Sequence, residues 1–60
     1  MTEGKVTVSI GRSAMGRVRL AVEGRYVDCF ARSRTDGVLG VGTRVRVVES
    51  TEECVVVEEA

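Results

Sequence analysis

The side chains that most often carry chemistry are scarce in this chain of 60 residues, which has no histidine and only two cysteines. Without histidine, the usual general base near neutral pH and the commonest metal ligand are missing. Cys29 and Cys54 are too few for a zinc site or a disulfide framework. Each lies in an apolar run, where a free cysteine behaves as a small hydrophobic residue. We therefore predict two free, packed thiols, with a disulfide between them as the alternative.

The other candidates for catalysis are hydroxyl and carboxyl groups. The sequence reveals no candidate base for the four serines, which are Ser9, Ser13, Ser33 and Ser50. Asp28 lies inside a predicted strand, where we expect Arg19 to neutralise it, whereas paired-carboxylate catalysis needs a carboxyl group with a raised pKa. The sequence thus predicts a protein that is not an enzyme, with no catalytic residue, no metal site and no cofactor.

A glycine-rich segment, residues 37–42 (GVLGVG), superficially matches a phosphate-binding loop. Such a loop needs a helix N-terminus after it, and a P-loop also needs a lysine. Here a run rich in valine and arginine follows instead. We interpret the segment as an ordered loop, from which Leu39 fills the interior.

The formal net charge is zero, but all nine basic residues lie within the first 46 positions and five glutamates follow. This distribution indicates either a solvated surface with an acidic end or a basic face for an acidic partner. For the second interpretation, spacing places each of two arginine pairs on one face of a strand. The candidate partner-binding residues are Arg17, Arg19, Arg44, Arg46 and, at the loop tip, Val41.

The elements that must position these arginines are β-strands. Valine dominates the apolar residues, and its stiff branched side chain suits a pleated surface better than a helix. Lys5–Ile10 alternates strictly and places Val6, Val8 and Ile10 on one face, which is the period of a half-buried strand.

Two strands joined by Glu23-Gly24 predict a hairpin, because glycine supplies the positive φ that a two-residue loop requires. Arg17–Val22 and Arg25–Arg32 then pair so that opposite charges face each other and an arginine lies beside an aromatic ring. A shift by one residue would set Leu20 against Asp28. The predicted pairs are Leu20 with Val27, Val18 with Cys29 and Gly16 with Ala31 on one face, and Arg19 with Asp28, Arg17 with Phe30 and Ala21 with Tyr26 on the other.

Two further strands, Thr43–Glu49 and Cys54–Glu58, bring the predicted total to five. The last is apolar on both faces at Val55, Val56 and Val57. A continuous apolar run indicates burial on both sides. We favour curling within a tight barrel over an edge presented to a second chain.

The order and spacing of several segments add a family resemblance. These are Gly16-Arg17-Val18 through Val22-Glu23-Gly24, then Tyr26 and Asp28, then residues 37–49 (GVLGVGTRVRVVE), and Val55-Val56-Val57-Glu58; Gly4–Val8 fits the opening. Together they resemble the soluble C-terminal domain of NfeD-like proteins over nearly the whole chain. Met15 stands where the family often has proline, and residues 50–53 lack its usual glycine.

The resemblance implies an all-β fold, a small five-stranded OB-like barrel, as one domain spanning residues 1–60. It also implies a non-catalytic module that assembles with membrane scaffold proteins of the stomatin, prohibitin and flotillin class; self-association stays open. The chain as given lacks the roughly 18 apolar residues of a membrane span. We expect it to be soluble, and membrane-associated in a full-length context, on a side that stays open.

An alternative is a small OB-fold that binds single-stranded nucleic acid. Such proteins combine a basic groove with aromatic rings on which bases stack. Only Tyr26 and Phe30 are available as rings, and a net charge of zero gives little non-specific attraction. A protein partner is therefore the favoured prediction.

Overall fold

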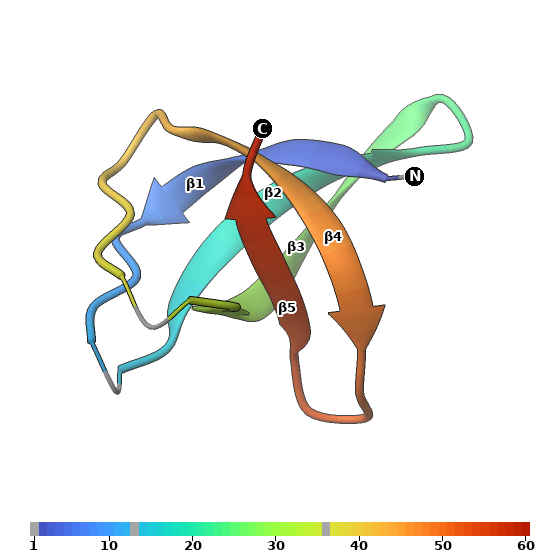
Figure 1. The fold of residues 1–60 in the computed structure, drawn as a ribbon. Helices are drawn as coiled ribbons and strands as arrows, with labels where there is room; N and C mark the ends of the chain where they lie inside the picture. Colours follow the sequence, from blue (N-terminus) through green and yellow to red (C-terminus); the bar gives the residue numbers. More distant parts are fainter. Residues whose placement is uncertain (1, 13, 36) are drawn as a thin grey trace.

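Short valine-rich alternating segments form five β-strands in the computed structural model of the chain, which describes residues 2–12, 14–35 and 37–60 (Figure 1). Of the predicted domain 1–60, Met1, Ser13 and Asp36 lie outside the described residues. The strands are β1 Glu3–Val8, β2 Gly16–Val22, β3 Arg25–Ser33, β4 Arg44–Ser50 and β5 Val55–Glu59. They close into a barrel in the order β1-β2-β3-β5-β4. The predicted all-β, five-stranded barrel is confirmed.

The β2–β3 hairpin has the register that the sequence predicted, from Gly16 opposite Ala31 to Val22 opposite Arg25. Its two loop residues, Glu23 and Gly24, both have positive φ, at 50° and 81°. Two positive φ angles in a two-residue loop define a type I′ turn, whose twist matches that of the strands. The hairpin is therefore set by local sequence.

β1 pairs with β2 on one side and with β4 on the other. The prediction that Val8 faces the core is wrong, because the β1–β2 register shifts between Val6 and Val8, and Val8 is 51% exposed. Ile10 turns inward again and is fully buried. Glycine at position 16 permits this geometry, since a Cβ there would overlap the carbonyl oxygens of Val8 and Ser9.

The core is a single cluster of aliphatic side chains inside the barrel. Leu39 enters it from the long β3–β4 connection, where its backbone N–H donates to Ile10 O at 2.9 Å and its carbonyl accepts from Ile10 N–H at 2.9 Å. The predicted role of Leu39 as an internal plug is confirmed. The buried residues are Val6, Ile10, Val18, Leu20, Ala31, Leu39, Val45, Val55 and Val57.

β5 lies between β3, to which it runs parallel, and β4, to which it runs antiparallel. It is therefore an interior strand of the barrel and not an edge. Val55 and Val57 face the core, while Val56 is half-buried on the other face. Within the described ranges, no helix is long and apolar enough to cross a membrane.

Candidate functional site

An open groove of about 600 Å³ crosses the outer face of β4, β1 and β2 and reaches β3. We call it the basic groove. Its floor is formed by the middle of β1, and its sides come from the β2–β3 hairpin and from the turn before β4. The lining residues are Glu3, Gly4, Lys5, Val6, Thr7, Arg19, Ala21, Tyr26, Val41, Gly42 and Arg44.

Three cations form a row across the basic groove. Lys5 of β1 is directly opposite Arg19 of β2 on one side and Arg44 of β4 on the other. All three side chains are exposed, and neighbouring strands are about 5 Å apart. Like charges directly opposite each other on a sheet are destabilising, so this row concentrates positive potential where the fold gains nothing from it.

Arg19 is the member of the row that forms an ion pair among the described residues. Its Nε lies 3.3 Å from Asp28 Oδ1 on β3, as the hairpin register predicted, and both side chains are about half exposed. Its guanidinium carbon also lies 5.9 Å from the centroid of the Tyr26 ring. An exposed pair of this kind contributes roughly 0–1 kcal/mol, so Arg19 is oriented but still open to a ligand.

Two exposed apolar side chains lie at the sides of the basic groove. Tyr26 of β3 is 74% exposed and Val41, in the turn before β4, is 69% exposed. The turn is fixed to the floor, because Gly42 N–H donates to Val6 O at 2.9 Å and Val6 N–H donates to Thr43 O at 3.0 Å. The groove therefore combines a charged floor with apolar contacts at both sides.

Arg17 and Arg46 lie outside the basic groove. The guanidinium carbon of Arg17 lies 4.9 Å from the centroid of the Phe30 ring, which confirms the predicted arginine–aromatic pair. Arg46 Nη2 lies 3.1 Å from Glu58 Oε2, and its Nε is buried without a hydrogen-bond partner among the described residues. Both arginines are engaged in the fold.

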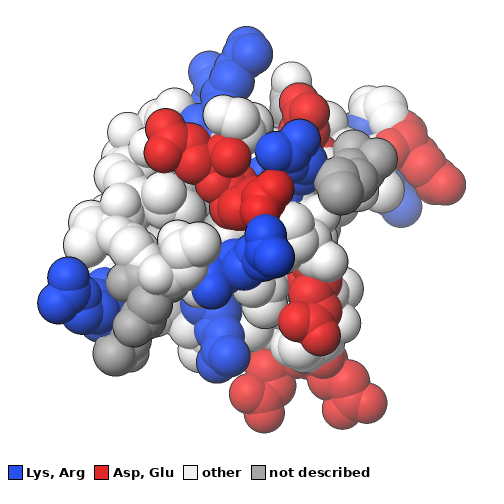
Figure 2. Space-filling model, in the orientation of Figure 1, with Lys and Arg blue, Asp and Glu red and all other residues white. Residues whose placement is uncertain are grey.

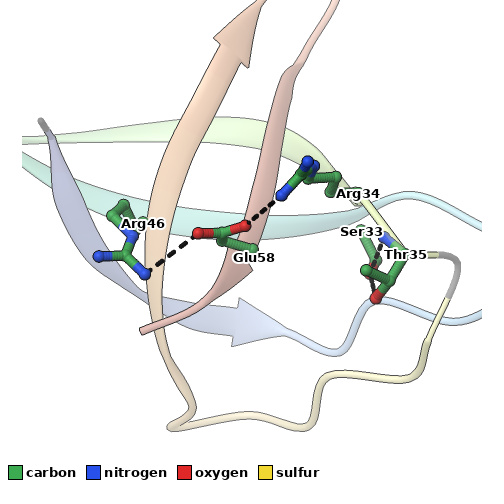
Figure 3. A network of polar contacts seen from close by, with 5 residues as sticks. All are labelled: Ser33, Arg34, Thr35, Arg46 and Glu58. Carbon is green, nitrogen blue, oxygen red and sulfur yellow. Dashed lines mark hydrogen bonds and ion pairs between the residues drawn. The ribbon is translucent and has the colours of Figure 1, made fainter.

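Glu58 of β5 lies at the centre of a polar network (Figure 3). Arg34 lies in the segment that follows β3, and its Nη1 donates to Glu58 Oε1 at 2.8 Å. Arg46 of β4 contacts the other carboxylate oxygen, Oε2. The hydrogen bond from Arg34 and the positive charges of both arginines hold the pKa of Glu58 below its ordinary value. The network links β4 and β5 to the end of β3.

The two cysteine thiols are the remaining reactive side chains to place. Cys29 and Cys54 are free and partly buried, and Cys29 packs against the core. No group of three or more carboxylate or thiol side chains is placed to hold a metal ion within residues 2–12, 14–35 and 37–60. The chemistry of the basic groove is attraction of negative charge combined with apolar contact.

The structure thus brings together three of the five predicted partner-binding residues, Arg19, Arg44 and Val41. It adds two that sequence reasoning did not place there, Lys5 and Tyr26. The alternation of Lys5–Ile10 puts Lys5 on the outer face, but only the order of the strands places it between two arginines. The predicted hairpin register pairs Tyr26 with Ala21 on the face that carries Arg19, and that signal points to the same side of the sheet.

The surface view shows how charge is distributed around this framework (Figure 2). Acidic side chains gather at the lower end, over the turn between β4 and β5. A broad uncharged area covers the β3–β4 connection, the region that carries exposed Val38 and Val41. The carboxylates of this turn are therefore on a separate part of the surface from the residues that line the basic groove.

Comparisons with known proteins agree with this architecture. The model of the NfeD C-terminal domain matches residues 3–58. Among solved structures, the chain is similar to the solution structure of the soluble domain of the NfeD protein YuaF from Bacillus subtilis, with a TM-score of 0.85 and 24% sequence identity over 97% of this chain and 69% of that chain. At that identity the likeness shows the fold. A comparison with curated proteins found no match.

Proposed function

Because the chain belongs to the NfeD C-terminal domain family, whose model matches residues 3–58, we propose that it is a non-catalytic interaction module. It binds a protein partner through the basic groove. The partner presents an acidic segment, and the family resemblance points to membrane scaffold proteins of the stomatin, prohibitin and flotillin class.

The row of Lys5, Arg19 and Arg44 is the observation that carries this proposal. The three cations lie on three adjacent strands in direct register. Asp28 pairs with Arg19 at one end of the row, and Glu3, two residues before Lys5 on β1, also lines the groove. Each like-charged neighbour costs roughly 0.2–1 kcal/mol relative to a neutral pair. An acidic ligand removes this repulsion. Ligand binding therefore explains the row of cations, whereas a contribution to the stability of the fold does not.

The sides of the basic groove restrict the shape of the ligand. Val41 and Tyr26 leave an open channel across the strands instead of a closed pocket, which suits an extended peptide better than a small molecule. Aromatic anchors and arginines are the residues most enriched at protein interfaces. An extended segment with carboxylates opposite the three cations and an apolar residue beside Tyr26 or Val41 is the expected ligand.

The test replaces the row as a unit, with Lys5→Ser, Arg19→Ser and Arg44→Ser in one variant. Binding to a purified stomatin-, prohibitin- or flotillin-type protein of the same organism is measured by calorimetric titration. Rim charges contribute roughly 0.2–1 kcal/mol each, so we expect the affinity to fall about tenfold and the wild-type affinity to weaken with salt.

Arg17→Ser is the matched control, because Arg17 lies on the same strand and is exposed but outside the basic groove. It should bind like the wild type. Equal weakening by Arg17→Ser and by the triple variant would mean that general surface charge, and not the groove, recognises the partner. Unchanged affinity of the triple variant would disprove the proposal.

Single-stranded nucleic acid is the second candidate, favoured by the placement of Tyr26 and Phe30 on one outward face of the hairpin. It is less well supported, because Arg17 and Arg19 lie over these rings and Asp28 lies between them. Titration with a labelled oligonucleotide at low salt separates the two candidates. Saturable binding that is lost in the triple variant would favour nucleic acid over a protein partner.

A further inference from the structure

The outer half of β3 has a free edge. β3 pairs with β2 from Arg25 to Ala31, but it meets β5 only from Ala31 to Ser33. Among the described residues, Arg25–Phe30 therefore has a neighbouring strand on one side alone. The β2–β3 hairpin extends beyond the barrel as an arm (Figure 1), and every residue of this stretch except Cys29 is exposed.

The direction of the backbone groups along this edge follows from the turn. A type I′ loop closes on a hydrogen-bonded pair, here Val22 and Arg25, and such pairs alternate along an antiparallel ladder. Arg25, Val27 and Cys29 therefore direct their N–H and C=O groups toward β2. Even-numbered residues direct theirs away from it, as Arg34 does when its N–H donates to Val57 O of β5 at 2.8 Å. Tyr26 and Asp28 thus present unpaired donors and acceptors.

The edge lacks the features that usually prevent strand addition, which are proline, a bulge or an inward-pointing charge at its centre. Its central residue, Val27, faces the inner side of the arm and is 39% exposed. Asp28, the one acid of the stretch, is paired with Arg19. The edge is thus open to strand addition at its centre.

We propose that this edge joins a second copy of the same chain, with the two β3 strands antiparallel about a two-fold axis at Val27. In that register Tyr26 faces Asp28 of the second copy, and the reverse, so both outward-directed pairs exchange backbone hydrogen bonds. The two Val27 side chains meet at the axis. A two-fold axis at Asp28 would set two carboxylates opposite each other, which is unfavourable.

Charge complementarity supports this occupant. In the proposed register Arg25 faces Cys29 of the second copy. Two residues after Cys29, at Ala31, β3 of that second copy begins to pair with its own β5 at Val55. The turn just before Val55 carries exposed Glu52 and Glu53, and a hollow of about 430 Å³ lies beside it. The loop end of each arm carries Arg25 and Glu23, and the hollow is lined by Arg32 as well as by the two glutamates. The arm of each copy therefore brings Arg25 toward the acidic turn of the other and Glu23 toward Arg32, twice per dimer.

The contact is small, because about six residues per copy take part, so the association is weak and depends on concentration. It is distinct from the function proposed for the basic groove, since it uses the backbone of Tyr26 while the groove uses its ring. Pairing would join the outer sheet surfaces of two barrels into one.

The experiment measures the mass of the chain by sedimentation equilibrium from micromolar to millimolar concentration. The wild type should rise from 6.5 kDa toward twice that value, with concentration-dependent NMR shifts at the amides of Tyr26 and Asp28. Val27→Lys and Val27→Glu should each stay monomeric, because like charges then meet on the two-fold axis. An equal mixture of the two should dimerise again, because opposite charges meet there.

Val38→Lys is the control, since Val38 is an exposed valine in the β3–β4 connection, away from the arm; it should associate like the wild type. A wild-type chain that stays monomeric at millimolar concentration overturns the proposal. So does association that persists in Val27→Lys alone, or a mixture of the two charged variants that remains monomeric. Thermal unfolding of each variant confirms that it is folded.

Discussion

At the scale of single residues, Gly16 is, with Gly4, one of two glycines where the structure leaves no room for a side chain. A Cβ on Gly16 would overlap the carbonyl oxygens of Val8 and Ser9, which are backbone atoms of the neighbouring segment. They can move only by disturbing the β1–β2 pairing. We therefore expect Gly16→Ala to lower the free energy of unfolding by about 1–3 kcal/mol.

Gly40→Ala is the matched control for this prediction. A Cβ at Gly40 would have no atom within 4 Å, and its φ is outside the positive range that side chains avoid. The substitution should leave stability unchanged or raise it by about 0.4–1 kcal/mol, because alanine restricts the unfolded chain. Urea denaturation compares the two variants, and equal stability would show that the close approach at Gly16 is absent in solution.

At the scale of elements, the β2–β3 turn contains one residue that is poorly suited to its conformation. Glu23 has a φ of 50°, in the left-handed region that L-residues other than asparagine, aspartate and glycine avoid. Asn-Gly is the preferred sequence of a type I′ turn. We expect Glu23→Asn to raise the free energy of unfolding by about 0.5–1 kcal/mol, measured by urea denaturation.

Gly24→Ala tests the same turn in the opposite direction. Gly24 has a φ of 81°, and a Cβ at this position would have no atom within 4 Å, so any loss of stability comes from backbone strain and not from a clash. The unfolding free energy should fall by about 1 kcal/mol or more. If both substitutions left stability unchanged, the loop would not have the type I′ geometry, and the alternation of edge groups on β3 would lose its basis.

The same elements show what the sequence could predict. The hairpin register was predictable because a two-residue loop fixes it and side-chain pairs such as Arg19–Asp28 confirm it locally. The outward turn of Val8 was not, because the register shift depends on how β1 meets β2 across the intervening loop. Non-local pairing leaves no periodic signal in either strand.

The candidate site likewise combines residues that the sequence predicts with residues that only the pairing of distant strands brings there. Arg19, Arg44 and Val41 were identified from residue type and strand face, whereas the part played by Lys5 depends on β1 lying between β2 and β4. The free edge of β3 depends on where β5 stops pairing with it. The apolar run of β5 had suggested an edge as one alternative; the structure places that edge on β3 instead.

At the scale of the whole molecule, the barrel closes through a short parallel contact. β3 and β5 pair in parallel over three residues each, Ala31–Ser33 with Val55–Val57. Just beyond, Glu58 binds Arg34 from the segment after β3 and Arg46 from β4. These ion pairs connect three parts of the barrel beside this short ladder, so they contribute stability that depends on the charge of one carboxylate.

That dependence predicts how stability changes with pH. The hydrogen bond from Arg34, together with the charges of Arg34 and Arg46, holds the pKa of Glu58 in the folded chain below its ordinary value of 4.5. A carboxyl group with a lowered folded-state pKa stabilises the fold above its unfolded-state pKa, and this contribution is lost as the pH falls through the folded-state value. Glu58→Gln should therefore lower the thermal midpoint near neutral pH, and the difference from the wild type should shrink as the pH falls below 4.5.

Glu59→Gln is the control, because Glu59 is exposed and forms no ion pair within the described residues; it should follow the wild type throughout. A thermal midpoint of Glu58→Gln that equals the wild-type value at neutral pH, or a difference that persists in acid, would show that the carboxylate does not hold the barrel closed.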